Sequence, residues 1–333
     1  MTTRIGINGF GRVGRAFARR CLDRTDLEVV AINDITDART LAHLLEFDST
    51  YGRLAAEVGH TDDAIVVDEV AIPVLSKRDP ATIDWGSFGA EIVIESTGKF
   101  REREDAALHF KGGARKVLIS APGKNADATI VIGVNDADYD TGTDDVISCA
   151  SCTTNCVAPM AKVLDDAFGL DQGLMTTVHA YTGDQMLLDG PHKDLRRARS
   201  AAISIVPTST GAARTTGIVI PKLAGRLDGV AVRVPVEDGS LTDLTAIVGR
   251  DVTADQVNDA FRQAADGGLA GILRYSTDPL VSRDIIGDPA SCVFDSGLTQ
   301  AARRLVKVFG WYDNEWGYTC RLVDLAALVG ASL

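Results

Sequence analysis

The chain has 333 residues, which corresponds to about two domains of ordinary size, each long enough to bury a core. Apolar residues make up 45% of the sequence and charged residues 24%, a composition that fits neither a disordered chain nor a collagen-like repeat. Acidic residues outnumber basic ones 46 to 34, and the net charge of −12 disfavours nucleic acid or an anionic membrane as the main partner. No apolar run approaches the roughly 18 residues of a membrane span. The N-terminus lacks the apolar core of a signal peptide, so we expect a cytoplasmic protein.

The first half of the chain alternates short β-branched runs with helical patterns, which is typical of a parallel sheet built from βαβ units. The expected strands are 4–8, 27–33, 92–96, 116–120 and 129–133, and the expected helices are 12–22, 38–46 and 102–111. Later strands are longer, at 174–181, 229–237 and 305–312, and a terminal helix is expected over 318–329. We therefore predict an α/β chain: a first domain over 1–150, to which a helix within 317–333 returns, and an α+β second domain over 151–316 with a mixed or antiparallel sheet.

A glycine pattern typical of dinucleotide binding follows the first expected strand. It reads Gly9-Phe10-Gly11-Arg12-Val13-Gly14 and opens an expected helix. The first glycine of such a pattern permits a tight turn, the second lets the backbone approach a pyrophosphate, and the third lets helix and strand pack closely. Asp34 ends the second expected strand, where a carboxylate binds a ribose and repels the 2′-phosphate of NADP. The pattern predicts a Rossmann-type NAD-binding domain.

Two polar loops follow later strands of the same domain. They are Ser96-Thr97-Gly98 and Ser120-Ala121-Pro122-Gly123, each at the carboxyl end of an expected strand. Ligands bind at this edge of open α/β sheets. Ordinary strand-ending turns use the same residue types, so the residues alone leave both interpretations open.

Three of the six cysteines fall within the run Cys149-x-x-Cys152-x-x-x-Cys156. Six unevenly spaced cysteines do not make the disulfide framework of a secreted domain, so we expect thiols. Ser151 is a natural N-cap for the helix expected over 156–168. Cys152 would then lie in the first helical turn, where the helix dipole lowers the pKa of a thiol. These features indicate a nucleophilic cysteine.

A thiol nucleophile also needs a base, and His179 is the best placed of the five histidines because it ends the expected strand LMTTVHAY. The alternative for the C-x-x-C spacing is a metal or redox site. A tetrahedral metal needs a fourth ligand, and the sequence offers no second C-x-x-C or H-x-H pair. We expect no metal, and we expect Cys156 to be a small buried residue.

Six segments, taken together and in order, carry a more specific signal. They are Asn8-Gly9-Phe10-Gly11-Arg12-Val13-Gly14-Arg15, Asn33-Asp34, Ala150-Ser151-Cys152-Thr153-Thr154-Asn155-Cys156, His179-Ala180-Tyr181-Thr182, Ser209-Thr210-Gly211-Ala212-Ala213 and Trp311-Tyr312-Asp313-Asn314-Glu315. From residue 3 to residue 329 the chain resembles phosphorylating glyceraldehyde-3-phosphate dehydrogenase of the glycolytic type. The ASCTTNC block is far more specific than the glycine pattern.

The resemblance implies that Cys152 forms a thioester with glyceraldehyde 3-phosphate, that His179 is the base, and that inorganic phosphate releases 1,3-bisphosphoglycerate. It implies NAD as cofactor, in contact with Gly9, Phe10, Gly11, Arg12, Val13, Gly14, Asn33, Asp34, Arg78, Ser96, Thr97, Gly98, Ser120, Asn314 and Tyr318. It implies contacts to the two phosphates from Ser151, Thr153, Thr182, Asp184, Arg197, Thr210, Gly211 and Arg233. It further implies a homotetramer in which the loop over 182–204 reaches a neighbour's cofactor site. No nucleic-acid or membrane partner is expected.

By pattern alone, several of these residues have simpler interpretations. Arg197 lies in a charged run that would ordinarily be a solvated face, Asn314 suits a turn, and Tyr318 suits a core position in the last helix. The chain also departs from the family's usual pattern in three places: Arg214-Thr215-Thr216 after STGAA, Cys149 in place of asparagine, and Gly190 in place of a leucine near the adenosine. Three other functions stay open: an erythrose-4-phosphate dehydrogenase that hydrolyses its thioester, a nucleotide-binding scaffold without turnover, and a thiol-based redox sensor.

Overall fold

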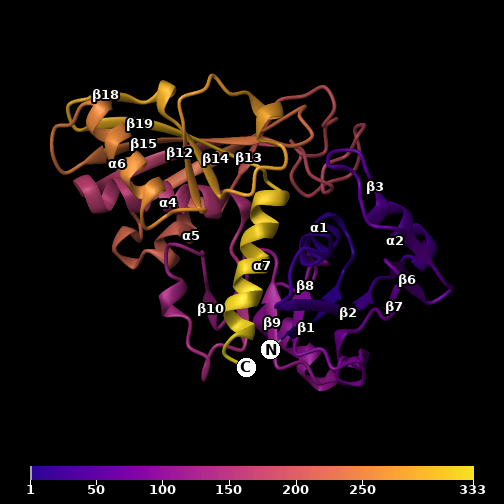
Figure 1. Ribbon diagram of the computed structural model, residues 1–333. Helices are drawn as coiled ribbons and strands as arrows, with labels where there is room; N and C mark the ends of the chain where they lie inside the picture. Colours follow the sequence, from indigo (N-terminus) through magenta and orange to yellow (C-terminus); the bar gives the residue numbers. More distant parts are fainter. Residues whose placement is uncertain (1) are drawn as a thin grey trace. The chain divides into compact units, whose positions relative to one another are not determined.

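The computed structural model of the chain describes residues 2–333, which form two compact units (Figure 1). The first unit comprises the chain up to Ile130, Ala137–Ala150 and Thr319–Leu333, and the second comprises Val131–Asp136 and Ser151–Tyr318. Each unit is built around one large sheet. The sequence does not predict that the short segment Val131–Asp136 leaves the first unit for the second.

The first unit contains a nine-stranded sheet in the order β10-β11-β9-β8-β1-β2-β7-β6-β5. Its strands are β1 (Thr3–Asn8), β2 (Leu27–Asn33), β5 (Val58–His60), β6 (Ala64–Val67), β7 (Val70–Leu75), β8 (Ile92–Glu95), β9 (Lys116–Ile119), β10 (Ala128–Thr129) and β11 (Val146–Ser148). Pairing is parallel from β10 through to β7, whereas β5, β6 and β7 pair antiparallel. The associated helices are α1 (Arg12–Cys21), α2 (Ala38–Glu46) and α3 (Arg103–Ala106).

Short elements fill the connections. They are the strand pair β3 (Phe47–Asp48) and β4 (Gly52–Arg53), and 3-10 turns at Pro80–Thr82, Gly86–Phe88, Ala107–Gly112 and Asp136–Asp138. The central strands are buried along their whole length, as expected for a parallel sheet covered on both faces. This burial extends to two charged side chains, Glu95 at the end of β8 and Lys116 at the start of β9.

Two elements of the first half differ from the sequence prediction. The strand expected over 129–133 shrinks to β10, because the Val131 N–H donates to Asn135 Oδ1 and the chain turns instead of pairing. The helix expected over 102–111 is only the short α3, followed by the 3-10 turn Ala107–Gly112, and the next residue, Gly113, has φ +95°.

The second unit contains an eight-stranded mixed sheet in the order β13-β14-β12-β15-β19-β17-β16, with β18 paired to β19. Its strands are β12 (Leu170–Ala180), β13 (Val206–Ser209), β14 (Leu227–Val234), β15 (Ser240–Val248), β16 (Leu273–Ser276), β17 (Cys292–Asp295), β18 (Gln300–Ala302) and β19 (Leu305–Tyr312). Its helices are α4 (Cys152–Phe168), α5 (Ala212–Val219) and α6 (Ala254–Asp266), with 3-10 turns at Pro221–Leu223, Ser282–Ile285 and Ser296–Leu298. The terminal helix α7 runs over Trp316–Gly330.

The sheet of the second unit is covered by helices on one face. Figure 1 shows α4, α5 and α6 on the same side of its strands, and α4 packs against β12, β15, β17 and β19. Side chains alternate accordingly. In β12, Thr177 and His179 are buried on the helix side, whereas Leu174 on the opposite side is 69% exposed. The face of the sheet that carries His179 is therefore distinct from the face that is open.

Gly14 of α1 packs directly on the turn that precedes the helix, where a Cβ would lie 2.3 Å from Gly9 O. We expect Gly14→Ala to lower the free energy of unfolding by about 1–3 kcal/mol, because the helix must move away from β1. Gly11→Ala is the matched control, since a Cβ at Gly11 meets no atom within 4 Å. Chemical denaturation of both variants measures the effect, and equal midpoints would contradict it.

Candidate active site

A cavity of about 260 Å³ lies in the first unit, at the carboxyl ends of its parallel strands. The side chains and backbone that line it are Asn8, Gly9, Gly11, Asn33, Asp34, Ile35, Lys77, Arg78, Ser96, Thr97, Lys99 and Phe100. They come from the last residues of β1 and β2 and from the loops after β1, β2, β7 and β8. This is the edge at which open α/β sheets bind their ligands.

The three glycines of the fingerprint take different roles beside this cavity. Gly9 has φ +94°, the left-handed region that favours glycine, and a Cβ there would lie 2.7 Å from the Thr97 nitrogen. Gly11 lines the cavity and has open space where a Cβ would point. Gly14 allows α1 to pack on the Gly9 carbonyl. The result is a tight turn with room for a ligand at the start of α1, where N–H groups attract phosphate.

Asp34 is held rigidly at the end of β2. The N–H of Phe10 donates to Asp34 Oδ2 at 2.7 Å, and the N–H of Thr36 donates to Oδ1 at 2.9 Å. Each carboxylate oxygen keeps a further lone pair for a ribose hydroxyl. The turn, the helix start and this carboxylate together fit a dinucleotide.

The cavity contains part of the cofactor set predicted from the sequence. Gly9, Gly11, Asn33, Asp34, Arg78, Ser96 and Thr97 line it, whereas Phe10, Arg12, Val13, Gly14, Gly98 and Ser120 are not among its lining residues. Five further residues also line it, although the sequence predicts no cofactor contact for them: Asn8, Ile35, Lys77, Lys99 and Phe100. These five end or follow the same strands as the predicted residues, and that position is the signal that would have found them.

In the second unit, the cysteine motif forms the start of α4. Ser151 has extended backbone, and its Oγ accepts a hydrogen bond from the Thr154 N–H at 3.0 Å. The helix therefore begins at Cys152, four residues before the apolar pattern predicts, because the serine cap fixes its start. Ala150 has φ +55°, a conformation that non-glycine residues seldom adopt. This backbone sharpens the turn that presents Cys152.

Cys152 and His179 lie in contact. Cys152 Sγ is 3.5 Å from His179 Nε2, and the cysteine is half-buried. His179 stands opposite Arg233 in the parallel register of β12 and β14, and Arg233 Nη1 lies 2.9 Å from His179 Nδ1. The fold thus brings together a thiol, an imidazole and a guanidinium that are distant in the sequence.

The hydrogen bonds around His179 assign its neutral tautomer. Arg233 Nη1 donates its two hydrogens to Ala180 O at 2.9 Å and to Thr182 Oγ1 at 3.2 Å. His179 Nδ1 lies 2.7 Å from the same Ala180 O, an atom that can only accept. We therefore place the ring proton on Nδ1. Nε2, which faces Cys152, is left as an acceptor.

Burial dominates the protonation of this pair. It raises the pKa of the Cys152 thiol, and Arg233 lowers that pKa by a smaller amount. Burial, followed by the charge of Arg233, lowers the pKa of His179 to about 3. The expectation that the helix dipole leaves Cys152 with a lowered pKa is therefore wrong, because removal from water disfavours the thiolate more strongly. Both shifts favour the uncharged forms, the thiol of Cys152 and the neutral imidazole of His179.

A chain of polar contacts extends from Arg233 into the loop after β12. Thr182 Oγ1 donates to Asp184 Oδ1, and Arg197 Nη1 donates to Asp184 Oδ2 at 2.6 Å. Arg197 Nε donates to Thr208 Oγ1 at 2.9 Å, so this arginine is not the solvated surface charge that its sequence run favours. Burial raises the pKa of Asp184, but the Thr182 hydrogen bond and the Arg197 charge lower it below its ordinary value. Asp184 therefore stays ionised and holds Arg197 in place.

Arg233 also has a donor that suits an anion. Its Nε is buried and has no hydrogen-bond partner within residues 2–333. A buried donor without a partner is costly, and a phosphate oxygen would satisfy it. The guanidinium thus fits a phosphorylated ligand beside the thiol.

The residues expected around a second phosphate lie at the starts of two helices that pack together, α4 and α5. Thr210 Oγ1 accepts a hydrogen bond from the Ala212 N–H at 3.2 Å, and Gly211 is the N-cap of α5. Ser151 and Thr153 lie at the start of α4. Their contact with phosphate stays a prediction.

Tyr312 belongs to this site, although the sequence predicts no role for it. Its hydroxyl lies 2.9 Å from Thr153 Oγ1 and 2.8 Å from Thr177 Oγ1, and its ring meets the His179 ring edge-on at 5.9 Å. It ends β19 on the helix-covered face of the sheet. The alternation of that strand would have placed it in the core, but not beside His179.

Asn314 and Tyr318, predicted to contact the nicotinamide, are both buried. Ser240 Oγ donates to Asn314 Oδ1 at 2.6 Å, and the Asn314 N–H donates to Asp238 Oδ1 at 3.2 Å. These bonds fix the position of the amide. The cofactor contacts of both residues stay predictions.

Within residues 2–333, no helix is long and apolar enough to cross a membrane. The same part of the chain holds no group of three His, Cys, Asp or Glu side chains placed to bind a metal ion.

Comparison with known proteins matches both units to one family. The glyceraldehyde 3-phosphate dehydrogenase NAD binding domain matches residues 3–103, and the C-terminal domain of the same enzyme matches residues 151–314. The chain belongs to the glyceraldehyde-3-phosphate dehydrogenase family. It is 61% identical to the glyceraldehyde-3-phosphate dehydrogenase of Streptomyces coelicolor and 58% identical to that of Mycobacterium tuberculosis, in each case over the full length of both chains. It is also 58% identical to glyceraldehyde-3-phosphate dehydrogenase 2 of Streptomyces avermitilis, again over both full lengths.

Family membership confirms four of the sequence predictions. They are the family itself, the fold class of a Rossmann-type domain joined to an α+β catalytic domain, the assignment as an oxidoreductase, and NAD as the cofactor. The roles of the individual site residues stay predictions.

Because Arg233 lowers the pKa of both Cys152 and His179, its removal is expected to raise both. The rate of Cys152 alkylation by iodoacetamide, measured across pH, should shift to higher pH in Arg233→Met. Arg226→Met is the matched control, because Arg226 lies just before the far end of β14 and donates to Leu170 O instead. Superimposable profiles for Arg233→Met and the parent would contradict the assigned coupling.

Proposed function

We propose that this chain catalyses the NAD-dependent, phosphorylating oxidation of glyceraldehyde 3-phosphate to 1,3-bisphosphoglycerate, the glycolytic reaction that also runs in reverse in gluconeogenesis. The observation that carries the proposal is the 3.5 Å contact between Cys152 Sγ and His179 Nε2. A thiol at a helix start, an imidazole whose Nε2 can accept, and a neighbouring guanidinium make up a nucleophile, a base and an anion site.

Cys152 acts first as nucleophile. Its sulfur attacks the aldehyde carbon while His179 Nε2 takes the thiol proton and passes it to the aldehyde oxygen, which gives a hemithioacetal. The low pKa of His179 keeps Nε2 unprotonated and ready to accept. Arg233 opposes a positive charge on His179, and a substrate phosphate bound to Arg233 would offset that opposition. Substrate binding would therefore strengthen the base.

Oxidation and phosphorolysis follow at the same sulfur. When bound, NAD would supply the hydride acceptor for this oxidation. His179 Nε2 takes the hydroxyl proton as the thioester forms on Cys152. Inorganic phosphate then attacks the thioester carbonyl, the C–S bond breaks, and the sulfur recovers its proton from the imidazolium. Gly9, Gly11, Asp34 and the other lining residues would hold the cofactor.

The two phosphates need cationic and hydrogen-bonding partners in a chain of net charge −12. We assign the substrate phosphate to Arg233, Arg197 and Thr182, which the Asp184 carboxylate joins into one hydrogen-bonded group. We assign inorganic phosphate to the second set, Ser151, Thr153, Thr210 and Gly211, at the starts of α4 and α5.

Initial rates of NADH formation from glyceraldehyde 3-phosphate test this function. We expect turnover only when inorganic phosphate or arsenate is present, and a preference for NAD over NADP because of Asp34. Cys152→Ser is expected to bind NAD as the parent does and to form no NADH. Turnover that does not depend on phosphate, or a higher rate with erythrose 4-phosphate, would indicate an erythrose-4-phosphate dehydrogenase that hydrolyses its thioester. Turnover by Cys152→Ser would exclude the thioester route.

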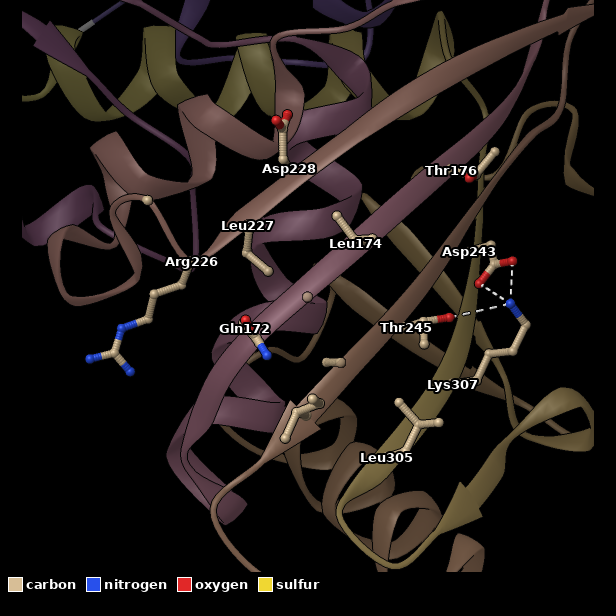
Figure 2. Close-up of a pocket in the computed structure, with 14 residues that line it drawn as sticks. Gln172, Leu174, Thr176, Arg226, Leu227, Asp228, Asp243, Thr245, Leu305 and Lys307 are labelled. Carbon is tan, nitrogen blue, oxygen red and sulfur yellow. Dashed lines mark hydrogen bonds and ion pairs between the residues drawn. The ribbon is translucent and has the colours of Figure 1, made fainter.

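We further propose that the protein is a homotetramer, and the open face of the second sheet supports this. A groove of about 630 Å³ runs over β14, β12, β15 and β19 on the face away from α4 (Figure 2). Figure 2 shows Leu174 and Leu305 among its lining side chains, and Lys307 Nζ bound to Asp243 Oδ1 at 2.6 Å. Leu174, Val230 and Leu305 are 69%, 51% and 47% exposed. A sheet face with three such exposed apolar side chains beside an ion pair suits a second copy of the chain.

The loop after β12 adds to this support. It exposes Leu187, Leu188, Leu195 and Ile203, each at least 74% exposed. Single exposed apolar side chains are common, but four in one loop indicate a surface that another chain covers.

We also propose that the enzyme acts in the cytoplasm, without a nucleic-acid or membrane partner, because its excess of acidic residues disfavours binding to either polyanion.

Leu174→Asp is expected to shift the protein from tetramer to smaller species, because a carboxylate on the sheet face cannot be buried against a second copy without a partner. Light scattering during size-exclusion chromatography measures the mass. Val281→Asp, which changes an apolar residue 58% exposed before a 3-10 turn, is the matched control. If the Leu174→Asp variant is still a tetramer, this face of the sheet is not part of the tetramer interface.

A further inference from the structure

A buried carboxylate, Glu95, lies at the end of β8 with only 2% of its surface exposed. Its Oε1 accepts hydrogen bonds from the Thr97 N–H at 2.9 Å and from Thr97 Oγ1. Its Oε2 accepts from Asn8 Nδ2 at 2.6 Å and from His109 Nε2 at 3.1 Å. Four donors therefore converge on one carboxylate. A carboxylate has no hydrogen of its own to donate, so all four contacts are satisfied when it accepts every bond.

On the side of Glu95 away from the cavity, Trp85 fixes the tautomer of the histidine that contacts the carboxylate. Trp85 Nε1, which can only donate, lies 3.0 Å from His109 Nδ1. His109 Nδ1 must therefore carry the lone pair, and Nε2 must carry the proton that points at Glu95. Trp85 and His109 are both fully buried. The indole thus selects the one neutral tautomer of His109 that can donate to the carboxylate.

On its other side, Glu95 sets the orientation of two amides in series. Because Asn8 Nδ2 donates to Glu95, Asn8 Oδ1 faces outward and accepts from Asn33 Nδ2 at 2.7 Å. Asn33 Oδ1 in turn accepts from the Lys77 N–H at 2.8 Å, and Asn33 Nδ2 donates to Lys77 O at 2.9 Å. Reversing either amide would bring donor against donor. The series therefore has one satisfied arrangement, which runs from the carboxylate to the backbone of Lys77.

All the residues that these hydrogen bonds connect to Glu95 on this side line the dinucleotide cavity. They are Asn8, Asn33, Lys77 and Thr97, which follow or end β1, β2, β7 and β8. Glu95, His109 and Trp85 do not line it. One buried carboxylate is thus bonded, directly or through amides, to all four strand ends that surround the ligand.

We propose that Glu95 is a positioning residue for dinucleotide binding, and that His109 supports it by donating a hydrogen bond from the tautomer that Trp85 selects. Its charge holds the four strand-end loops in the orientation that meets the cofactor, although it does not itself reach the cavity. The inference rests on the proposed use of this cavity for NAD. It predicts that a change at Glu95 acts on the dissociation constant and KM for NAD more than on kcat at saturating NAD.

Glu95→Gln is the decisive variant, because it replaces one accepting oxygen by a donating NH2 of nearly the same size. Whichever way the new amide turns, it meets either Asn8 and His109 or the Thr97 N–H with a donor. We expect the dissociation constant for NAD to rise by about tenfold, the effect of losing charge-assisted hydrogen bonds. Calorimetric titration with NAD, well below the unfolding temperature of each variant, measures it.

Lys116→Met separates this role from general loss of stability. Lys116 is also buried in the first unit, where its Nζ donates to Thr141 O at 2.7 Å and Asp144 O at 2.9 Å. It starts the neighbouring strand β9 and does not line the cavity. We expect Lys116→Met to lower the unfolding temperature with no change in NAD affinity. An equal loss of affinity in Lys116→Met and Glu95→Gln would overturn the proposal.

Trp85→Phe provides a second test that does not depend on the folding of Glu95→Gln. It removes the indole N–H, so His109 can move its proton to Nδ1 and present a lone pair to Glu95. We expect the NAD dissociation constant to rise by about two- to fivefold, as for one hydrogen bond. Unchanged affinity in Trp85→Phe, or in a folded Glu95→Gln, overturns the positioning role. Failure of the parent protein to bind NAD would instead overturn the proposed function.

Discussion

The parallel register of β12 with β14 is the constraint on which the chemistry of the second unit depends. It sets His179 opposite Arg233, so that the guanidinium reaches the carbonyl that also holds the imidazole proton. The same contact lowers the pKa of His179 and opposes the rise in the pKa of Cys152. A slip of one residue would turn either side chain to the other face of the sheet. One backbone pairing thus fixes the position of both side chains and adds to the effect of burial on the pKa of His179.

Much of the site was predictable because its signals are local. Cys152 follows a capping serine, His179 ends an apolar strand, and Asp34 ends the second strand after a glycine turn; each pattern depends on a few neighbouring residues. The direction of the Cys152 pKa was not predictable, because it depends on burial by distant segments. The partnership of Tyr312 with Thr153 joins residues 159 positions apart, which no periodicity reveals. The shortening of the strand expected over 129–133 has a local origin instead: the Asn135 side chain accepts a hydrogen bond from the Val131 N–H, which the pattern assigns to the sheet.

Both units use buried polar groups where an apolar core would be simpler. The Tyr312 hydroxyl lies within hydrogen-bond distance of two threonine hydroxyls, and the Tyr312 ring contacts His179. Glu95 accepts four hydrogen bonds at the end of β8. Buried polar groups of this kind contribute less to stability than to the choice of one arrangement, because any alternative leaves a donor or acceptor unsatisfied. In each unit the constrained arrangement belongs to the residues that would meet a ligand.

The alternation of side chains along β12 has a consequence for how such a chain can vary. Odd-numbered positions such as Thr177 and His179 face the helices, and even-numbered positions such as Leu174 and Thr176 face the open groove. Point substitutions can therefore remodel the outer surface, and with it the choice of binding partner, while the reactive side stays unaltered. An insertion or deletion of a single residue in the strand is different, because it would turn the side chains beyond that point to the opposite face of the sheet and so change both surfaces at once.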